Sequence, residues 1–147
     1  MRAPVAAAFV VALAAAFGVV AADLSQGAAR AAAEAFGRAL STGHAEGIRP
    51  LLPQRGKVTL SLSRMGPEDG SFGSSQVEAV LREFLARGSV GSFAILQCES
   101  DGKTTALAHA RALVTDREGH SARVGIHLGF QPEDGRWVVR EVKESAE

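Results

Sequence analysis

Glu141 is the one acidic side chain that the strand pattern predicts among apolar residues. It lies in the alternating run that begins at Trp137, and we expect it on the buried face of that strand, beside Ile126. A carboxyl group in dry, apolar surroundings has a raised pKa and can act as a general base. At a solvated rim, or paired with an arginine, the same side chain would have no catalytic role. Glu141 is the single catalytic candidate, and the sequence favours a protein that is not an enzyme.

Two histidines, His109 and His127, are expected side by side on neighbouring strands, on the sheet face away from the helices. Two imidazoles need a third ligand to hold a metal ion, and Arg140, expected next in the row, opposes a cation. Cys98, expected on the same face near Thr105, has no basic neighbour that would activate its thiol. A single cysteine also excludes an intramolecular disulfide and a cysteine-built zinc site. We expect no metal and no cofactor.

The composition excludes further classes of function. With 16 basic and 16 acidic residues the net charge is zero, so no basic surface points to a nucleic acid partner. The sequence contains no tyrosine, which excludes every mechanism that needs a phenol. The spacings of a phosphate-binding loop and of a zinc-protease helix are absent as well.

Residues 1–22 have the pattern of a signal peptide. A positive start, Met1-Arg2, precedes an uncharged apolar run over 5–20, and small residues close the segment before Asp23. The alternative, a membrane anchor, needs a run of about 20 apolar residues. We expect cleavage after Ala22, no stable membrane anchor after cleavage, and an exported protein that is periplasmic or secreted.

The remaining residues, 23–147, are expected to form one domain of helices followed by strands. Ser25 is a candidate N-cap for a helix that ends near Leu40, and a capping box of Ser75 and Glu78 begins a later helix. The other predicted elements are a short helix at 44–52, a strand at 57–63, a loop at 66–73 and strands at 90–99, 104–115, 121–131 and 136–143. This order predicts an α+β domain with its helices packed on one face of a curved antiparallel sheet.

The predicted turns determine which side chains face the helices. A two-residue turn at Asp101-Gly102, a three-residue loop at 117–119 and a four-residue turn at 132–135 place Ile95 opposite Ala108, and Leu128 opposite Val139. The residues then expected on the helix-facing side, where they would line any pocket, are Phe93, Ile95, Gln97, Ala108, Ala110, Ile126, Leu128, Phe130, Trp137, Val139 and Glu141.

The opposite, outer face of the predicted sheet combines apolar side chains with histidine and arginine. A free sheet face is normally polar, whereas apolar residues bordered by arginine are typical of an interface. The predicted interface residues are Leu96, Leu107, His109, Arg111, His127, Val138 and Arg140. We therefore predict a homodimer packed sheet to sheet. The alternative is a monomer whose outer face is covered by its own C-terminal tail or by another protein.

Several stretches carry a resemblance to a known family. They are the alanine-rich first helix through Gly43, Val58–Leu62, Ser75–Leu85, Ser92–Ile95 and Trp137–Val142. With them the chain resembles the NTF2-like (SnoaL-like) superfamily, most closely the small exported bacterial DUF4783 family. The resemblance implies a conical domain, a pocket between sheet and helices, and frequent dimerisation through the sheet. Isomerases of this fold use a tyrosine, which this chain lacks, and the DUF4783 family has no assigned activity.

These observations lead to three hypotheses about function. The first is an exported, non-catalytic NTF2-like domain that binds a small apolar ligand or a protein partner. The second is a small-molecule lyase or isomerase that uses Glu141 as its general base. The third is a purely structural or dimerisation domain whose interior is filled by its own side chains.

Overall fold

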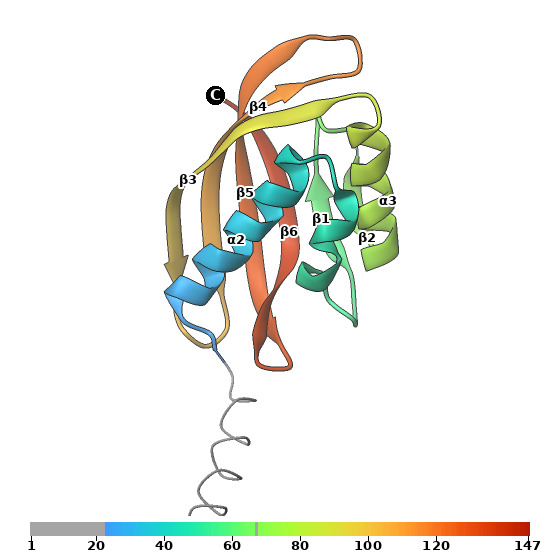
Figure 1. The fold of residues 1–147 in the computed structure, drawn as a ribbon. Helices are drawn as coiled ribbons and strands as arrows, with labels where there is room; N and C mark the ends of the chain where they lie inside the picture. The colour runs from blue at the N-terminus through green and yellow to red at the C-terminus, as the bar shows by residue number, and fades with distance from the viewer. Residues whose placement is uncertain (1–22, 67) are drawn as a thin grey trace, which may run out of the picture.

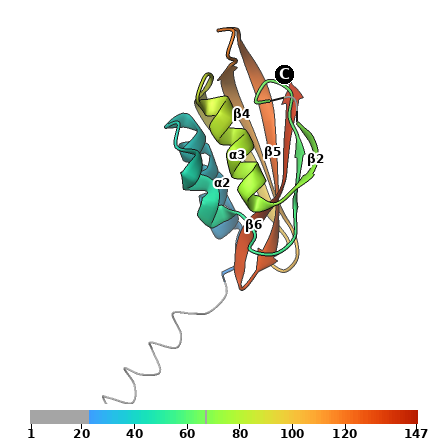
Figure 2. The ribbon, with the colours of Figure 1, turned by 90° about the vertical axis from the view of Figure 1, so that its right-hand side faces the viewer.

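Helices and strands form two layers in the computed structural model, which describes residues 23–66 and 68–147. All helices lie on one face of a six-stranded sheet (Figures 1 and 2). The helical elements are α2 (Gln26–Ser41), the 3-10 helix η1 (Ala45–Leu51) and α3 (Ser74–Leu85). The strands are β1 (Val58–Ser61), β2 (Asp69–Phe72), β3 (Ser89–Ser100), β4 (Ala106–Thr115), β5 (Ser121–Glu133) and β6 (Arg136–Ala146). The predicted α+β class is confirmed.

The strand order of the sheet is β2-β1-β6-β5-β4-β3. Consecutive strands from β3 to β6 are antiparallel, whereas β1 pairs in parallel with β6. Two expectations were wrong here: the sheet is mixed rather than wholly antiparallel, and the predicted loop at 66–73 contains β2. This short strand pairs with β1 as an edge strand. Among the described residues, no helix combines the length and apolar character that crossing a membrane requires.

The helix ends follow local hydrogen-bonding signals. Ser25 caps α2 as predicted, since its Oγ accepts from the amide of Ala28 at 3.1 Å. The N-cap predicted for α3 was wrong by two residues. The amide of Gly73 donates to Oε1 of Gln76 at 2.9 Å, so the capping interaction belongs to this pair and not to Ser75 and Glu78.

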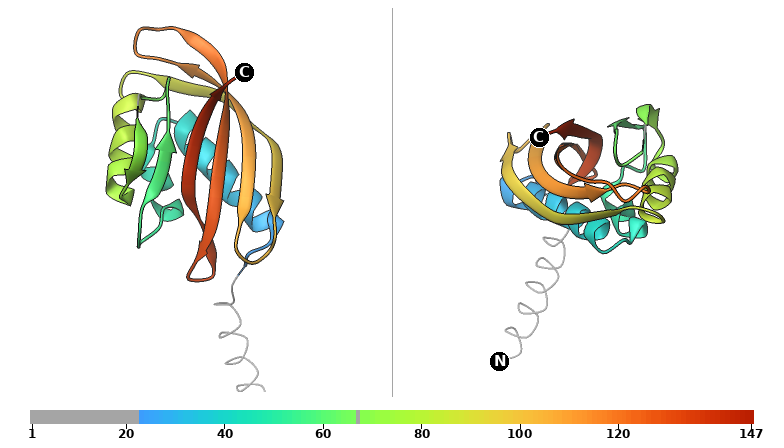
Figure 3. Two further views of the ribbon diagram at one scale, coloured as in Figure 1. Left: turned by 180° about the vertical axis from the view of Figure 1, so that it is seen from behind. Right: turned by 90° about the horizontal axis from the view of Figure 1, so that it is seen from above.

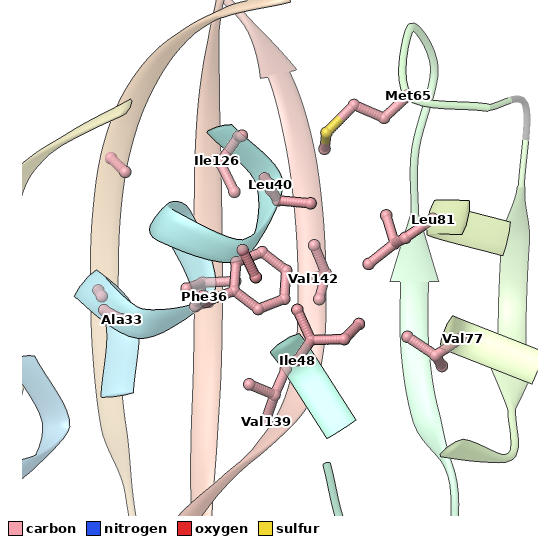
Figure 4. Close-up of a cluster of buried hydrophobic side chains, with 14 of the residues drawn as sticks. Ala33, Phe36, Leu40, Ile48, Met65, Val77, Leu81, Ile126, Val139 and Val142 are labelled. Carbon is pink, nitrogen blue, oxygen red and sulfur yellow. The ribbon is translucent and has the colours of Figure 1, made fainter. Parts of the chain in front are cut away.

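The core lies between the helices and the inner face of the sheet. Phe36 of α2 is at its centre, surrounded by side chains from η1, α3, β5 and β6 (Figure 4). Gly37 allows α2 to approach β3 closely, because a Cβ atom there would lie 2.1 Å from the ring of Phe93. Phe93, which was expected on the helix-facing side, and Phe84 of α3 are half-buried at the margin of this core.

The register of β4 and β5 is the one predicted. Ala110 lies opposite Ile126, and His109 lies opposite His127. The intervening loop closes with a hydrogen bond from the amide of Asp116 to the carbonyl of His120 at 2.9 Å. Gly119 adopts the positive φ of 86° that this three-residue loop requires.

The register of β3 and β4 differs from the prediction because the connecting loop is longer. Asp101 does not begin a two-residue turn; its Oδ1 accepts from three successive amides, those of residues 103–105. β4 therefore begins at Ala106, and bulges in β3 shift the pairing further. Cys98 faces the core, opposite Ala108, and Gln97 lies on the outer face, opposite His109.

The register of β5 and β6 was also predicted wrongly. Asp134 and Gly135, with φ of 52° and 77°, form a two-residue turn in place of the predicted four-residue turn. A bulge between Gly129 and Phe130 then adds one more residue of shift. As a result, Glu141 lies opposite Gly129 on the outer face, and Glu144 occupies the inner position opposite Ile126.

Candidate functional site

The inner side chains that were expected to line a pocket form the core instead. Seven of them retain 4% or less of their accessible surface. Side chains around an empty space large enough for water would keep more, so the space beside these seven is filled by the helices. They are Ala108, Ala110, Ile126, Leu128, Phe130, Trp137 and Val139. Phe93 and Ile95 pack against the same core, while Gln97 and Glu141 point away from it.

Glu144 is the acid that lies where Glu141 was expected. Its side chain is buried, and its two oxygens accept four hydrogen bonds from the segment that follows β1. The donors are the amides of Ser63, Arg64 and Met65 and the hydroxyl of Ser63, at 2.7–3.2 Å. A carboxylate with this many donors holds a loop in place and has no free lone pair directed at a substrate.

The other two buried acids are committed to structure as well. Arg49 donates two hydrogen bonds to Glu78 and lowers the pKa of that carboxyl, although burial opposes the shift. The amide of Gln54 lowers the pKa of Glu133, again against burial. Both groups stay ionised near neutral pH. Neither Glu78 nor Glu133, then, has the raised pKa of a general base.

Cys98 belongs to the core and not to the outer face where it was predicted. Its side chain is buried among apolar residues, and that burial raises the pKa of its thiol. A thiol with a raised pKa carries little of the reactive thiolate at neutral pH.

The outer face carries the two histidines in the predicted adjacent positions. The rings of His109 and His127 stack with their centroids 4.2 Å apart and an angle of 8° between their planes. Nε2 of His127 lies 3.3 Å from the hydroxyl of Ser145. Burial lowers the pKa of His127, the nearby His109 and Lys143 lower it further, and Glu147 and Glu141 raise it. His127 is therefore a neutral ring at pH 7.

The stacked geometry of this pair does not suit a metal ion. The nitrogen lone pairs of an imidazole lie in the plane of its ring, so two parallel rings direct their lone pairs along parallel lines. One ion cannot lie on both lines at bonding distance. The part of the chain that the structure describes also has no group of three or more histidine, cysteine or acidic side chains able to hold a metal.

Beside the histidines the outer face has a groove of about 370 Å³. Its floor is at Gly129, where the absence of a side chain leaves a notch between Leu107 and Glu141. Lys143 and Glu99 complete its charged walls. These groove residues were missed because their positions depend on the wrongly predicted registers. The only signal in the sequence was the spacing of Gly125 and Gly129, two residues on either side of His127.

Three large apolar side chains are exposed on the outer face, and one of them, Leu107, lines the groove. Leu96, Leu107 and Leu113 keep 49%, 55% and 38% of their accessible surface. The outer face of the sheet looks toward the viewer in the left panel of Figure 3, where the strands are in front and the helices behind. No element of the described chain covers this face.

Two residues that were predicted for the interface have other surroundings. Val138 is fully buried, so it cannot contact a partner. Arg140 does not continue the histidine row, in which Lys143 is the next residue. Its guanidinium donates to the carbonyl oxygen of Arg55 at 2.8 Å and lies 3.5 Å from Glu133. The positions of both side chains follow from the β5–β6 register, which differs from the predicted one.

A second hollow, of about 650 Å³, lies at the end of α3. Its walls include Val80 and Phe84, together with acidic and basic side chains in similar number. Arg64 and Asp116, both in its wall, lie 3.8 Å apart. Charges that are compensated in this way give no preference for an anionic or a cationic ligand.

Comparison with known proteins identifies the fold. The sequence matches no protein-family model and no curated protein. Among solved structures, a DUF4783 family protein from Bacteroides uniformis is 10% identical, and the match covers 78% of this chain and 95% of that one with a TM-score of 0.61.

Two further structures extend this likeness. An LEH-like epoxide hydrolase from M. tuberculosis is 18% identical, with 80% of each chain covered and a TM-score of 0.58. An NTF2-like protein of unknown function from Shewanella oneidensis is 17% identical, with 76% of this chain and 91% of that chain covered and a TM-score of 0.56. At such identities the likeness concerns the fold and not the activity. The chain has the NTF2-like fold, with helices packed on one face of a curved, unclosed sheet.

Proposed function

We propose that this protein is an exported, non-catalytic NTF2-like domain that forms a homodimer through the outer face of its sheet. The observation that carries the proposal is the exposure of Leu96, Leu107 and Leu113 together on one uncovered face. Fully burying one leucine contributes about 1.5–3 kcal/mol. Because these three leucines keep 38–55% of their accessible surface, burying the remainder in two copies would gain roughly half of that value for each, which offsets part of the cost of association.

The interior supports a binding role over a catalytic one. The helix-facing side chains fill the space in which an enzyme of this shape would hold its substrate. Glu141, the candidate base, lies on the exposed outer face and not in the dry, apolar interior where it was expected. The lyase or isomerase hypothesis therefore has no observation in its favour.

A small ligand in the outer groove is the second candidate. The groove volume of about 370 Å³ lies within the range of known ligand sites, roughly 300–1,000 Å³. Native mass spectrometry of the purified mature protein tests this candidate, because a retained ligand adds a discrete mass that disappears on denaturation.

Sedimentation velocity at neutral pH tests the homodimer. We expect the mature protein to sediment as a dimer at tens of micromolar and Leu107→Glu to sediment as a monomer. Ala31→Glu is the matched control, because it introduces the same charge at an exposed position of α2 on the opposite side of the molecule. A monomeric wild-type protein, or equal disruption by both substitutions, would show that the outer face is not the interface.

A further inference from the structure

Two adjacent rows of side chains on the outer face have opposite character. One row, which we call the acid row, crosses strands β3 to β6 through Glu99, Leu107, Gly129 and Glu141. The neighbouring base row crosses the same strands through Gln97, His109, His127 and Lys143. The pairing register is what aligns each row. Such an arrangement is complementary to a copy of itself in which the two rows have changed places.

The two terminal charges of these rows are available for a partner. Glu141 and Lys143 form no ion pair and no hydrogen bond with any described residue, although both lie on the outer face of β6. Neighbouring side chains on the same face do pair. Nε2 of Gln97 donates to Oε1 of Glu99 at 2.7 Å, and Nε of Arg111 lies 3.4 Å from Oε1 of Glu147. Within the two rows the unpaired charges are thus one acid and one base, the set that a two-fold interface pairs twice, while Arg123 lies outside the rows, opposite Leu113.

The centre of the two rows has complementary shape as well as charge. Gly129 in the acid row has no side chain and leaves a notch, which is narrow because a Cβ there would lie 3.3 Å from the Cβ of Glu141. Its neighbour two residues earlier on β5, His127, carries a planar, half-buried ring in the base row. Exchanging the rows therefore sets a ring over a notch at two places in the interface.

We propose that the homodimer has its two-fold axis across the strands, midway between the two rows. Glu141 of each copy then pairs with the partner's Lys143, and His127 of each copy packs over the partner's Gly129. This inference rests on the proposed homodimer and specifies its geometry.

The other simple geometry is less favourable. A two-fold axis parallel to the strands, along β5, would set each row over the same row of the second copy. Lys143 would then meet the partner's His109, and Glu141 would meet the partner's Leu107. This arrangement leaves both terminal charges unpaired and buried, which costs free energy.

The size of the face is sufficient for a specific dimer. Outward positions on a strand repeat every ~6.8 Å and strands lie ~4.8 Å apart, so the acid row, the base row and one further row on each side cover roughly 500 Å² in projection over strands β3 to β6. Side-chain relief raises the accessible area toward the roughly 800 Å² per partner of a standard interface.

Charge exchange within one chain tests the axis. Glu141→Lys and Lys143→Glu each replace an ion pair by a like-charge contact, twice per dimer, and we expect each to weaken dimerisation by about tenfold or more. The double variant restores opposite charges at both contacts, and its dissociation constant should return to within about threefold of wild type. Glu46→Lys, an exposed reversal on η1, is the control and should leave the constant unchanged.

Filling the notch is a second, independent measurement. Gly129→Leu should abolish the dimer by excluding the partner's His127, and circular dichroism should show that the monomer remains folded. Glu141→Gln and Lys143→Gln, alone and together, form a double-mutant cycle with neutral side chains, which we call the neutral cycle. If the two residues pair across the interface, the coupling energy calculated from the four dimer dissociation constants must differ from zero. This cycle decides the question if a reversed-charge variant fails to fold.

The outcomes separate the geometry from the proposed function. A monomeric wild-type protein refutes both. The homodimer stands if the wild-type protein is a dimer that Leu107→Glu disrupts. The axis is nevertheless refuted if the double charge exchange does not restore the dissociation constant and the neutral cycle shows no coupling energy. Recovery in the double variant supports it.

Discussion

Replacing Glu144 should destabilise the domain far more than replacing Glu141, three residues earlier on the same strand. Glu144 is buried and binds residues 63–65, whereas Glu141 is exposed and has no hydrogen-bond partner in the described chain. The comparison tests the register of β6, because a pairing shifted by three residues would exchange the two roles.

The magnitude follows from the four hydrogen bonds. Glu144→Ala leaves the amide of Met65 buried without an acceptor, which costs about 1–3 kcal/mol. The donors of Ser63 and Arg64 are only part-buried and can turn toward water, so each contributes less. We expect a total loss of about 3 kcal/mol, a large share of the roughly 5–15 kcal/mol typical of a domain. Glu141→Ala should change the free energy of unfolding by less than about 0.5 kcal/mol.

Urea denaturation followed by circular dichroism measures both values, at a protein concentration at which every variant is monomeric. Glu144→Gln separates charge from packing, since its Oε1 can still accept from the amides of Ser63 and Met65 while its NH2 group faces the amide of Arg64. It should lose less than Glu144→Ala, because the buried amide of Met65 keeps an acceptor. Equal effects of Glu141→Ala and Glu144→Ala, or a loss below about 1 kcal/mol for Glu144→Ala, would refute this register.

Three further predictions follow from particular residues. Gly37→Ala should cost about 1–3 kcal/mol in urea denaturation because its Cβ would strike Phe93, whereas Gly27→Ala, with its nearest neighbour at 3.8 Å, should be neutral or stabilising. The lowered pKa of Glu133 means that its contribution to stability is present above the ordinary glutamate value of about 4.3 and is lost as the pH falls below it; Glu133→Gln should flatten the fall of stability in acid, and an unchanged slope would contradict this. N-terminal sequencing of native protein should find Asp23 first, and retention of Met1 would exclude cleavage after Ala22.

The parts of the fold that were predicted correctly depend on neighbouring residues. The cap of Ser25 involves an amide three residues away, and the loop before β5 is closed by residues within five positions of each other. Such signals can be seen in a short stretch of sequence. They were sufficient for α2, for the second long hairpin and for the adjacency of His109 and His127.

The two Asp-Gly pairs show where local reasoning was insufficient. Asp134-Gly135 forms the two-residue turn for which this dipeptide is known, with both φ angles positive. Asp101-Gly102 does not, because the carboxylate of Asp101 binds three amides and the hydroxyl of Thr104, which widens the loop. The same dipeptide therefore forms a two-residue turn in one hairpin and begins a longer loop in the other. The threonine at position 104, within reach of the aspartate, was the available signal.

The bulges had no local signal, and they decide where the candidate site lies. Each adds one residue to one strand, and a shift of one residue moves every following side chain to the other face. In β6 the bulge and the short turn together move Glu141 from the predicted pocket to the outer groove and bring Glu144 inside. Glu141, the acid that suggested a catalytic site, therefore lies on the outer surface of the sheet.

The parallel pairing of β1 with β6 gives a physical reason for the buried acids. β1 has only four residues, and its neighbours in the chain, Gln54 and Met65, lie beyond its two ends. Glu133 accepts from the amide of Gln54, and Glu144 accepts from the amide of Met65, so two carboxylates from the β5–β6 hairpin hold the segment on both sides of the strand. A short parallel strand is otherwise weakly held. Because the interior acids stabilise this pairing, the polar groups left free for recognition are those of the outer face, Glu141 and Lys143 among them.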